Sequence, residues 1–416
     1  SAAASDIEWQ DFFSDARLQR LIGAALHNNR DLRVAMLNIE QARAQLQLRR
    51  ADELPTVGIG ASGSRQPSGS GSIASVYSAG LAVTAYELDF FGRVRSLSAA
   101  ALAQYLATEE ARKNVQIALV SAVANTYLNL LADDALLALT RRTLVTREDS
   151  LKLTKLKFEV GAASELDYRQ AESLREGARA TLAQLMRQRA LDENALVLLL
   201  GQALQADLPQ GAEIGDQMLI GELPAGMPSE VLARRPDVRQ AEQQLIAANA
   251  NIGAARAAFF PKISLTGSAG TASSQLSGLF RSGSAAWSFM PQLLLPIFDS
   301  GRNQATLDVA NVNRDIALAQ YEKAIQAAFR EVADALAGRA TLGEQLRAQE
   351  AQAHAEAQRY KLADLRYRNG AASYLDVLDA QRALFAAQQA LVPVQAQQVQ
   401  NKVSLYKVLG GGWKTP

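Results

Sequence analysis

The chain has 416 residues, of which 48% are hydrophobic and 20% are charged, so it can form one large or two ordinary domains. Its formal net charge of +1 supplies no field that would attract nucleic acid. It contains no Cys and only two His, which excludes thiol catalysis, disulfides and zinc sites built on Cys or clustered His, so we expect no cofactor and no metal.

The chain lacks the run of about 18 consecutive apolar residues that a membrane-spanning helix requires. The densest apolar run, at 195–200, is far too short. We therefore predict that no helix of this chain crosses a bilayer. The absence of a cofactor fingerprint or a paired nucleophile and base also argues against an enzyme.

The sequence contains two tandem copies of one unit. FEVGAASELDYRQA, within 156–171, matches YRNGAASYLDVLDA, within 365–380, with identical residues 209 positions apart. Such self-similarity decides the architecture. We predict repeats at 29–201 and 229–410, joined by a linker at 202–228 and flanked by 1–28 and 411–416. These last three segments would form a mixed equatorial belt.

Each copy opens with a helix-compatible segment that stops at Pro55 in the first copy and at Pro261 in the second. After each Pro the pattern changes to the alternation of strands, interrupted by a Gly- and Ser-rich loop. We therefore predict two strands within 55–90 and two within 261–298, four in total.

A long helical hairpin completes each copy. The segments 93–160 and 302–369 contain no Pro and carry apolar residues at steps of three and four. Each would extend roughly 100 Å as a helix. Gly161 and Gly370 interrupt the pattern, so we predict hairpins at 93–200 and 302–409 with tips at these glycines. Ser164 and Ser373 are suitable N-caps for the returning helices.

Four Gly-rich strands cannot close a barrel, because closure takes about eight strands or more. Two chains would supply eight strands and three would supply twelve. The apolar stripe on the helices, mainly Ala, Val and Leu, is too small for a solid bundle of this length. We therefore predict a tube made by several chains, with strands in a bilayer and helices in water.

The motifs that carry this organisation resemble the TolC-like family of outer-membrane efflux proteins, and most closely its OprM-like members. They are YELDFFGR at 86–93, RRPDV at 234–238, PQLLLPIF at 291–298 and LDVLDAQ at 375–381. The resemblance covers nearly the whole chain. It implies a mixed α and β membrane protein: a homotrimer with a 12-stranded β-barrel in the outer membrane, continued by a long periplasmic α-helical barrel.

The resemblance also implies a function and partners. The chain would be the exit duct of a tripartite pump for drugs and small toxic compounds. It would contact outer-membrane lipid and dock to a periplasmic adaptor and an inner-membrane pump of the resistance-nodulation-division type. OprM-like members begin with an acylated Cys, which is not present ahead of Trp9. Alternatives are a duct for type I protein secretion and a soluble coiled-coil scaffold, although a scaffold does not explain the strands.

The candidate gate is a stripe just beyond the second tip. The spacing places Leu375, Asp379 and Arg382 on one helix face, with Asp376 adjacent. In the TolC-like family the positions of Asp376 and Asp379 line the closed periplasmic entrance, and threefold symmetry would gather their carboxylates around one axis. The alternative is that acidic residues here only favour the helix dipole.

The resemblance implies two further sets of residues near the tips. Asp167 and Tyr367 match positions that clasp one hairpin to the other, while the family's Arg beyond the tip is Ala372 here, so we expect Arg368 to replace it. Alternatively, Asp167 only caps a helix and Arg368 is solvated. The adaptor-docking tips would be Gly161, Ala162, Ala163, Ser164, Gly370, Ala371, Ala372 and Ser373.

Aromatic residues in the strand segments, among them Tyr77 and Trp287, are candidates for a girdle at the bilayer interface. Ordinary core aromatics are the alternative, because the register of the strands is not fixed by the sequence.

Overall fold

The computed structural model describes residues 7–67, 69, 71–211, 213, 214, 219 and 234–413. Most of the predicted linker at 202–228 lies outside these residues beyond position 211, as do 1–6 and 414–416. The chain divides into two compact units. The first unit comprises residues 1–35, 112–236 and 325–416, and the second comprises 36–111 and 237–324, so both repeats contribute to both units.

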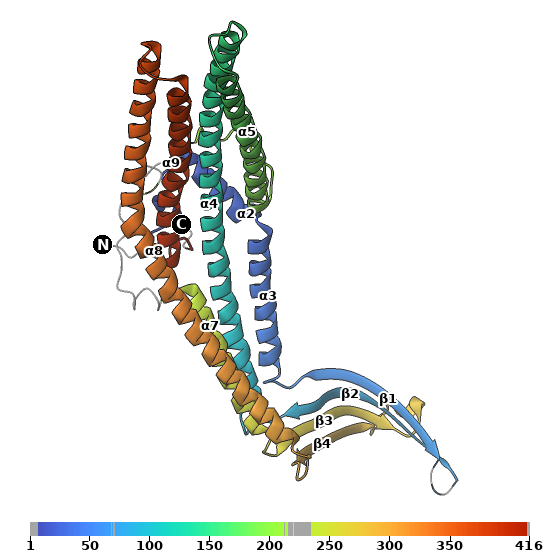
Figure 1. Cartoon of the computed structure of the whole chain (residues 1–416). Coiled ribbons are helices and arrows are strands. Elements are labelled where there is room, and N and C mark those ends of the chain that lie inside the picture. Colours follow the sequence, from blue (N-terminus) through green and yellow to red (C-terminus); the bar gives the residue numbers. More distant parts are fainter. Residues whose placement is uncertain are drawn as a thin grey trace. The chain divides into compact units, whose positions relative to one another are not determined.

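Six helices form where the periodicity predicts them (Figure 1). The opening helices are α3 (Arg30–Ala51) and α7 (Pro236–Ala257). The hairpins consist of α4 (Arg93–Glu159) with α5 (Glu165–Leu200), and α8 (Arg302–Arg368) with α9 (Tyr374–Val408). Gly161 and Gly370 end α4 and α8 with φ values of 74° and 73°, a left-handed conformation that glycine adopts without strain.

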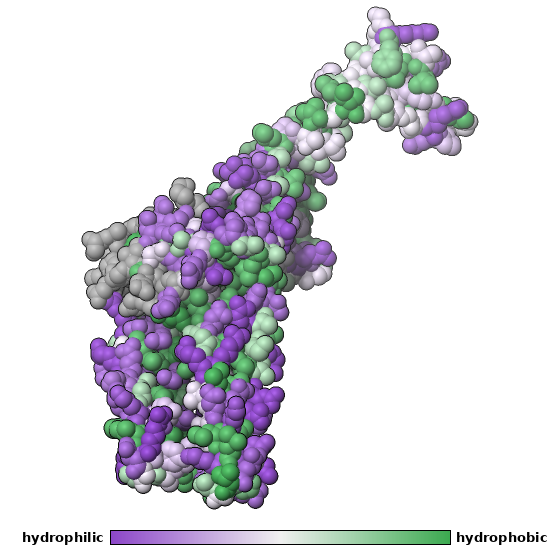
Figure 2. Space-filling view, turned by 90° about the horizontal axis from the view of Figure 1, so that it is seen from above, coloured by the Kyte–Doolittle hydropathy of each residue, from purple (hydrophilic) through white to green (hydrophobic). Residues whose placement is uncertain are grey.

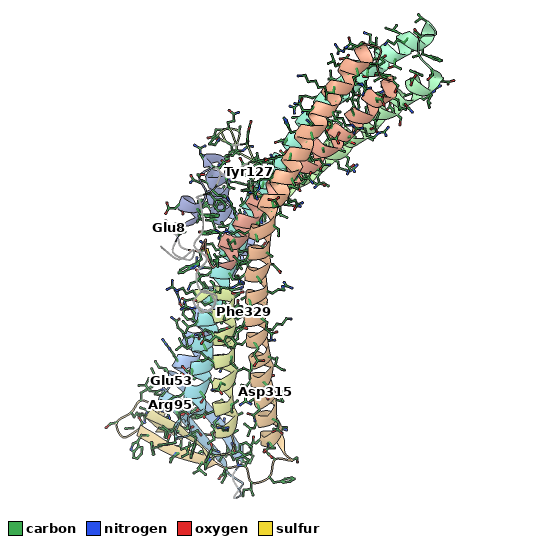
Figure 3. The ribbon with its side chains drawn as sticks, turned by 60° about the vertical axis from the view of Figure 1, so that its left-hand side comes forward. Glu8, Glu53, Arg95, Tyr127, Asp315 and Phe329 are labelled. Carbon is green, nitrogen blue, oxygen red and sulfur yellow. The ribbon has the colours of Figure 1, made fainter. Side chains whose placement is uncertain are left out.

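The core of the first unit is built around two buried tyrosines. Short helices α1 (Trp9–Phe12) and α2 (Ala16–Asn28) bring Phe12 onto Tyr406, with ring centroids 4.0 Å apart. The Tyr406 hydroxyl donates to the Ile7 carbonyl at 2.7 Å. Tyr127 of α4, labelled in Figure 3, donates to Asp15 at 3.1 Å. The N-terminal segment is thereby anchored to both hairpins.

One helix is apolar enough to be mistaken for a membrane span. An 18-residue window of α4 reaches a mean hydropathy of 1.5, the only such helix in the part of the chain that the structure describes. However, 61% of that window is buried inside the protein. Its apolar residues, including Val123 and Leu128, belong to the core that surrounds Tyr127. The hydropathy of α4 is therefore that of a core helix.

The four predicted strands form one antiparallel sheet in the order β1-β2-β3-β4 (Figure 1). They are β1 (Val57–Pro67), β2 (Ile73–Glu87), β3 (Lys262–Ser273) and β4 (Ala285–Leu294). The pairing of β2 with β3 joins the two repeats. The sheet is open, because β1 and β4 each pair along one side only among the described residues.

The two faces of the sheet differ in chemistry. Directly paired residues share a face, and alternate residues along a strand share it too. The register therefore collects on one face Val57, Ile59, Tyr77, Leu81, Val83, Ile263, Leu265, Trp287, Phe289 and Leu293. The other face is mostly small or polar, and its serines pair across strands: Ser62 with Ser78 at 2.8 Å and Ser268 with Ser288 at 2.7 Å. This contrast is typical of a barrel wall between lipid and a polar lumen.

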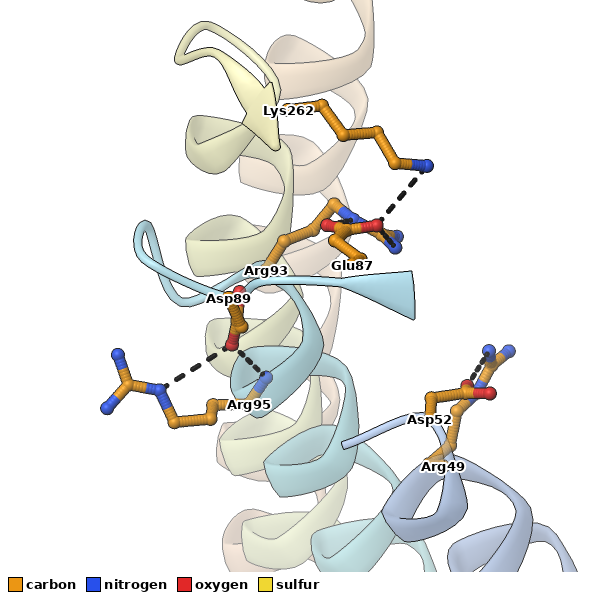
Figure 4. Close-up of polar contacts among 7 residues, drawn as sticks. All are labelled: Arg49, Asp52, Glu87, Asp89, Arg93, Arg95 and Lys262. Atoms are coloured by element: carbon orange, nitrogen blue, oxygen red, sulfur yellow. Dashed lines mark hydrogen bonds and ion pairs between the residues drawn. The ribbon is translucent and has the colours of Figure 1, made fainter. Parts of the chain in front are cut away.

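A salt-bridge network fixes the passage from β2 into α4 (Figure 4). Glu87 accepts hydrogen bonds from Arg93 Nε at 2.7 Å and Nη2 at 2.6 Å, and its Oε2 lies 3.2 Å from Lys262 Nζ. Asp89 accepts from the backbone N–H of Arg95 at 2.8 Å, which satisfies a free donor in the first turn of α4. The acidic and basic residues of the 86–93 motif therefore set the start of the long helix.

The helices leave many apolar side chains uncovered. In the space-filling view, hydrophobic areas alternate with hydrophilic ones over the helical surface (Figure 2). Val145, Leu153, Leu156 and Val160 of α4 are among the apolar side chains that are exposed in the single chain. Within one chain this apolar face is only partly covered, as expected for a helix that packs against further copies.

Two glycines let β2 and β3 lie unusually close. A Cβ atom added at Gly80 would lie 2.5 Å from the Ala269 carbonyl oxygen and 2.6 Å from Gly270 Cα. Contacts this short between a side chain and backbone cannot be relieved by a rotamer change. Gly60, which pairs with Gly80 on the other side, has nothing within 4 Å of its added Cβ.

We expect Gly80→Ala to force β2 from β3 at a cost of about 1–3 kcal/mol, typical of overpacking. The fraction of heat-modifiable, correctly inserted protein in membrane extracts should fall several-fold. Gly60→Ala is the matched control and should behave as wild type. Equal yields of the two variants would show that the close approach is unimportant.

A pair of carboxyl groups lies between the helices of the first hairpin. Asp133 of α4 is buried within hydrogen-bonding reach of Asp192 of α5. Arg189 is engaged elsewhere, at 2.6 Å from Asp134 and 2.5 Å from Glu193. Burial, followed by the hydrogen bond and charge of Asp192, raises the pKa of Asp133 to about 7.

Because the folded pKa of Asp133 exceeds its unfolded value, the folded state binds the extra proton, and stability falls as pH rises from about 4 to about 7. We expect Asp133→Asn to lack this fall and to gain about 1–4 kcal/mol above pH 7, since one unit of pKa corresponds to about 1.4 kcal/mol. Thermal unfolding in detergent at pH 5 and pH 8 measures it. The control Asp134→Asn, which breaks an ion pair, should give no gain in stability. If the stability of wild type and of Asp133→Asn changed in parallel with pH, the assignment of the raised pKa to Asp133 would be refuted.

Candidate functional site at the hairpin tips

Both tips are built by the same local structure. After each glycine, the next N–H groups return to the preceding helix: Ala162 donates to the Lys157 carbonyl at 2.7 Å, and Ala371 to the Arg366 carbonyl at 2.8 Å. Space around Gly161 and Gly370 is open, with nothing within 4 Å of an added Cβ. The tips therefore present small residues and accessible backbone.

Reciprocal capping boxes begin the returning helices. The Ser164 hydroxyl accepts from the Asp167 N–H at 3.1 Å, while the Asp167 carboxylate accepts from the Ser164 N–H at 3.2 Å. Ser373 and Asp376 repeat the arrangement at 3.3 and 3.1 Å. The carboxylates of Asp167 and Asp376 thus bind their own helix ends.

The four residues of the candidate gate are all exposed in the single chain. Leu375 is 47% exposed, and Asp376, Asp379 and Arg382 also face outward on α9. Asp379 has a partner that the sequence did not suggest, because Arg359 of α8 donates to its carboxylate. That hydrogen bond, together with Glu356, raises the pKa of the Arg359 guanidinium. The stripe is therefore available for contacts beyond the chain, with Asp379 tied to α8.

Of the three expected clasp residues, the structure brings only Tyr367 to the other hairpin. Lys157 of α4 donates to the Tyr367 hydroxyl at 2.5 Å. Arg368 instead pairs with Asp364 one turn back on its own helix, at 2.8 Å, and Asp167 is used in its capping box. In the single chain, Arg368 is thus exposed and Asp167 caps its own helix, as in the alternative interpretation of each residue.

A second contact between the hairpins, made by Tyr374, was not predicted from the sequence. The Tyr374 hydroxyl donates to Ser150 Oγ at 2.8 Å, and its ring lies 5.1 Å from that of Tyr367. A signal for these tyrosines exists in the repeat. At the same offset of 209 residues, the first copy has Phe158 and Glu165 where the second has Tyr367 and Tyr374. The hydroxyl groups are thus specific to the second hairpin.

The register places the two candidate girdle residues on one face of the sheet. Trp287, 81% exposed, pairs with Ala269 and so lies in the row of Leu81, four residues from Tyr77 on the same strand. Both side chains therefore belong to the apolar face. No group of three or more His, Asp or Glu that could hold a metal occurs among the described residues.

Comparison with known proteins gives the family. The chain matches the family described as outer membrane efflux protein over residues 21–202 and 227–411. It is 52% identical to the solvent efflux pump outer membrane protein SrpC of Pseudomonas putida, over 97% of this chain and 87% of the relative. It is 51% identical to the antibiotic efflux pump outer membrane protein ArpC of the same species, over 99% and 86%.

The fold agrees with a solved channel of this kind. The open state of the MtrE outer membrane channel of Neisseria gonorrhoeae superposes with a TM-score of 0.92, at 44% identity, over 100% of this chain and 93% of that one. The match includes the four antiparallel strands and the long helices. The chain therefore belongs to the outer membrane efflux protein family, as the outer-membrane channel component of an efflux pump in a Gram-negative bacterium.

Proposed function

We propose that three copies of this chain close one barrel in the outer membrane and continue as a helical tube in the periplasm, forming the exit duct of a tripartite pump. The observation that carries this proposal is the open sheet, with one apolar face and two edges that are unpaired within the described part of the chain. Three four-stranded sheets give twelve strands, enough to leave a lumen, whereas about eight strands close around side chains.

The cargo and partners follow from the same proposal. The relatives are named for the efflux of solvents and antibiotics, which supports apolar solvents and drugs as the cargo here. A periplasmic adaptor would meet the tips at 161–164 and 370–373, whose small residues allow close approach. An inner-membrane pump of the resistance-nodulation-division type would supply the cargo. By analogy with OprM-like members, an acyl chain would also anchor the duct in the outer membrane.

The gate is the second part of the proposal. Three copies would bring Leu375, Asp376 and Asp379 around a common axis, where exposed side chains of α9 can meet. Because Asp376 caps its own helix, Asp379 is the carboxylate with more freedom to act across the axis, once its bond to Arg359 is rearranged. Tyr367 and Lys157 would hold the second hairpin against the first in the closed state.

Efflux is tested by complementation. In a strain that lacks its own outer-membrane efflux channel, the chain together with its pump should restore resistance to toluene and to antibiotics, and the detergent-purified assembly should have three times the mass of the 44.7 kDa chain. The same strain should not regain type I secretion of a protein toxin. Secretion without drug resistance would reverse the assignment, and a stable monomer would remove the barrel.

Asp379→Ala should increase single-channel conductance and uptake of a large antibiotic several-fold, because it removes the axial ring of Asp379 carboxylates that would keep the entrance closed. Asp334→Ala, which breaks an exposed pair with Arg330 on α8, is the control and should leave conductance unchanged, with stability altered by at most about 1 kcal/mol. If Arg359→Ala opens the channel as much as Asp379→Ala does, the ion pair and not an axial ring of carboxylates keeps it closed.

A further inference from the structure

A cavity of about 190 Å³ lies between the two hairpins in the first unit. It is bordered by α4, α8 and α9, is partly open to the surface, and is lined by Leu139, Arg142, Thr143, Thr146, Arg147, Tyr360, Gln381, Leu384, Phe385 and Gln388. The lining combines an apolar part with hydroxyl, amide and guanidinium groups, and none of these residues is acidic. Neither the gate nor the tips use this cavity.

The central group of the cavity is a buried cation that has no counterion among the described residues. Arg147 is 5% exposed; its Nη1 donates to the Leu174 carbonyl at 2.8 Å, and its guanidinium lies 4.8 Å from the centre of the Phe385 ring. Its Nε has no hydrogen-bond partner in the described part of the chain. No carboxylate pairs with Arg147 in the part of the chain that the structure describes. A buried charge in this condition is costly unless an anion reaches it.

The surroundings add to the positive field. Arg142 lines the same cavity, and burial, reinforced by the charge of Arg382, lowers the pKa of Arg147. A second buried polar group is also incomplete. Gln381, 8% exposed, donates to the Tyr360 hydroxyl at 3.2 Å, while its Oε1 has no partner among the residues that the structure describes. Among the described residues Arg147 Nε is therefore an unused donor and Gln381 Oε1 an unused acceptor, so a carboxylate in this cavity would bond to the arginine and not to the amide oxygen.

We propose that this cavity binds a small organic carboxylate with an aromatic or short aliphatic body. Arg147 would bind the carboxylate, since a guanidinium fits two carboxylate oxygens. Thr143 would donate a further hydrogen bond, because the Thr146 hydroxyl already donates to the Arg142 carbonyl. Leu139, Leu384 and Phe385 would cover the apolar body. The volume suits a single ring, because cavities of about 150 Å³ bind benzene. The bound anion would bridge α4 and α9 and hold the hairpins together.

Benzoate is the probe for the detergent-purified full-length assembly, measured by isothermal titration. We expect saturable binding and a raised unfolding temperature, whereas benzyl alcohol, of similar shape without the charge, should bind at least tenfold more weakly. Arg147→Gln should weaken benzoate binding at least tenfold. Arg347→Gln, which removes an exposed arginine of α8 paired with Glu344, is the control and should change nothing. No saturable binding by wild type, or equal binding by Arg147→Gln, overturns the proposal.

A second variant covers the case in which Arg147→Gln does not fold. Gln388→Glu places a carboxylate in the cavity wall, so it should neutralise Arg147, preserve or raise stability and abolish benzoate binding, while Gln388→Met should retain binding. Crystals soaked in 4-bromobenzoate should show anomalous density against Arg147. A cavity that holds water only, or that is filled by a carboxylate of a neighbouring copy, would refute the site.

Discussion

Unpaired backbone at the two outer strands is the constraint on which this structure depends. β1 and β4 each have one edge without hydrogen-bond partners among the described residues, on a sheet whose one face is apolar. In hydrocarbon every such N–H and C=O group costs several kcal/mol, so spanning strands exist only in closed sets. A chain with four strands must therefore share its wall with other copies, and the incompletely covered helices follow the same rule.

The glycines and serines of the inner strands serve that wall. Where Gly80 meets Gly270, backbones approach more closely than any side chain allows, and the neighbouring serines bond across strands. The same residues weaken each strand considered alone, because glycine packs nothing and loses more entropy on ordering. Small and polar residues are favourable here because this face of the wall would be narrow and in contact with water.

Much of the fold is visible in the sequence because its causes are local. Proline, glycine and periodicity bounded the six helices and four strands, and the Ser caps with Asp three residues later are a known helix-start pattern. By the same local rules, the cap role of Asp167 and the Arg368–Asp364 pair were readable. The bonds of Tyr367 with Lys157 and of Asp379 with Arg359 were not, because they depend on how whole helices rotate against each other.

The two hairpins of a chain are alike in backbone but unlike in side chains. Phe158 stacks on Tyr168 in the first, while the second carries the hydroxyls of Tyr367 and Tyr374 at the corresponding turns. A ring of three such chains would present six hairpin tips, in which the two kinds alternate. A binding protein that distinguishes the two kinds of tip would bind at three of the six positions only. Gene duplication followed by divergence would thus fix the rotation of the partner about the axis of the channel, which six identical hairpins could not do.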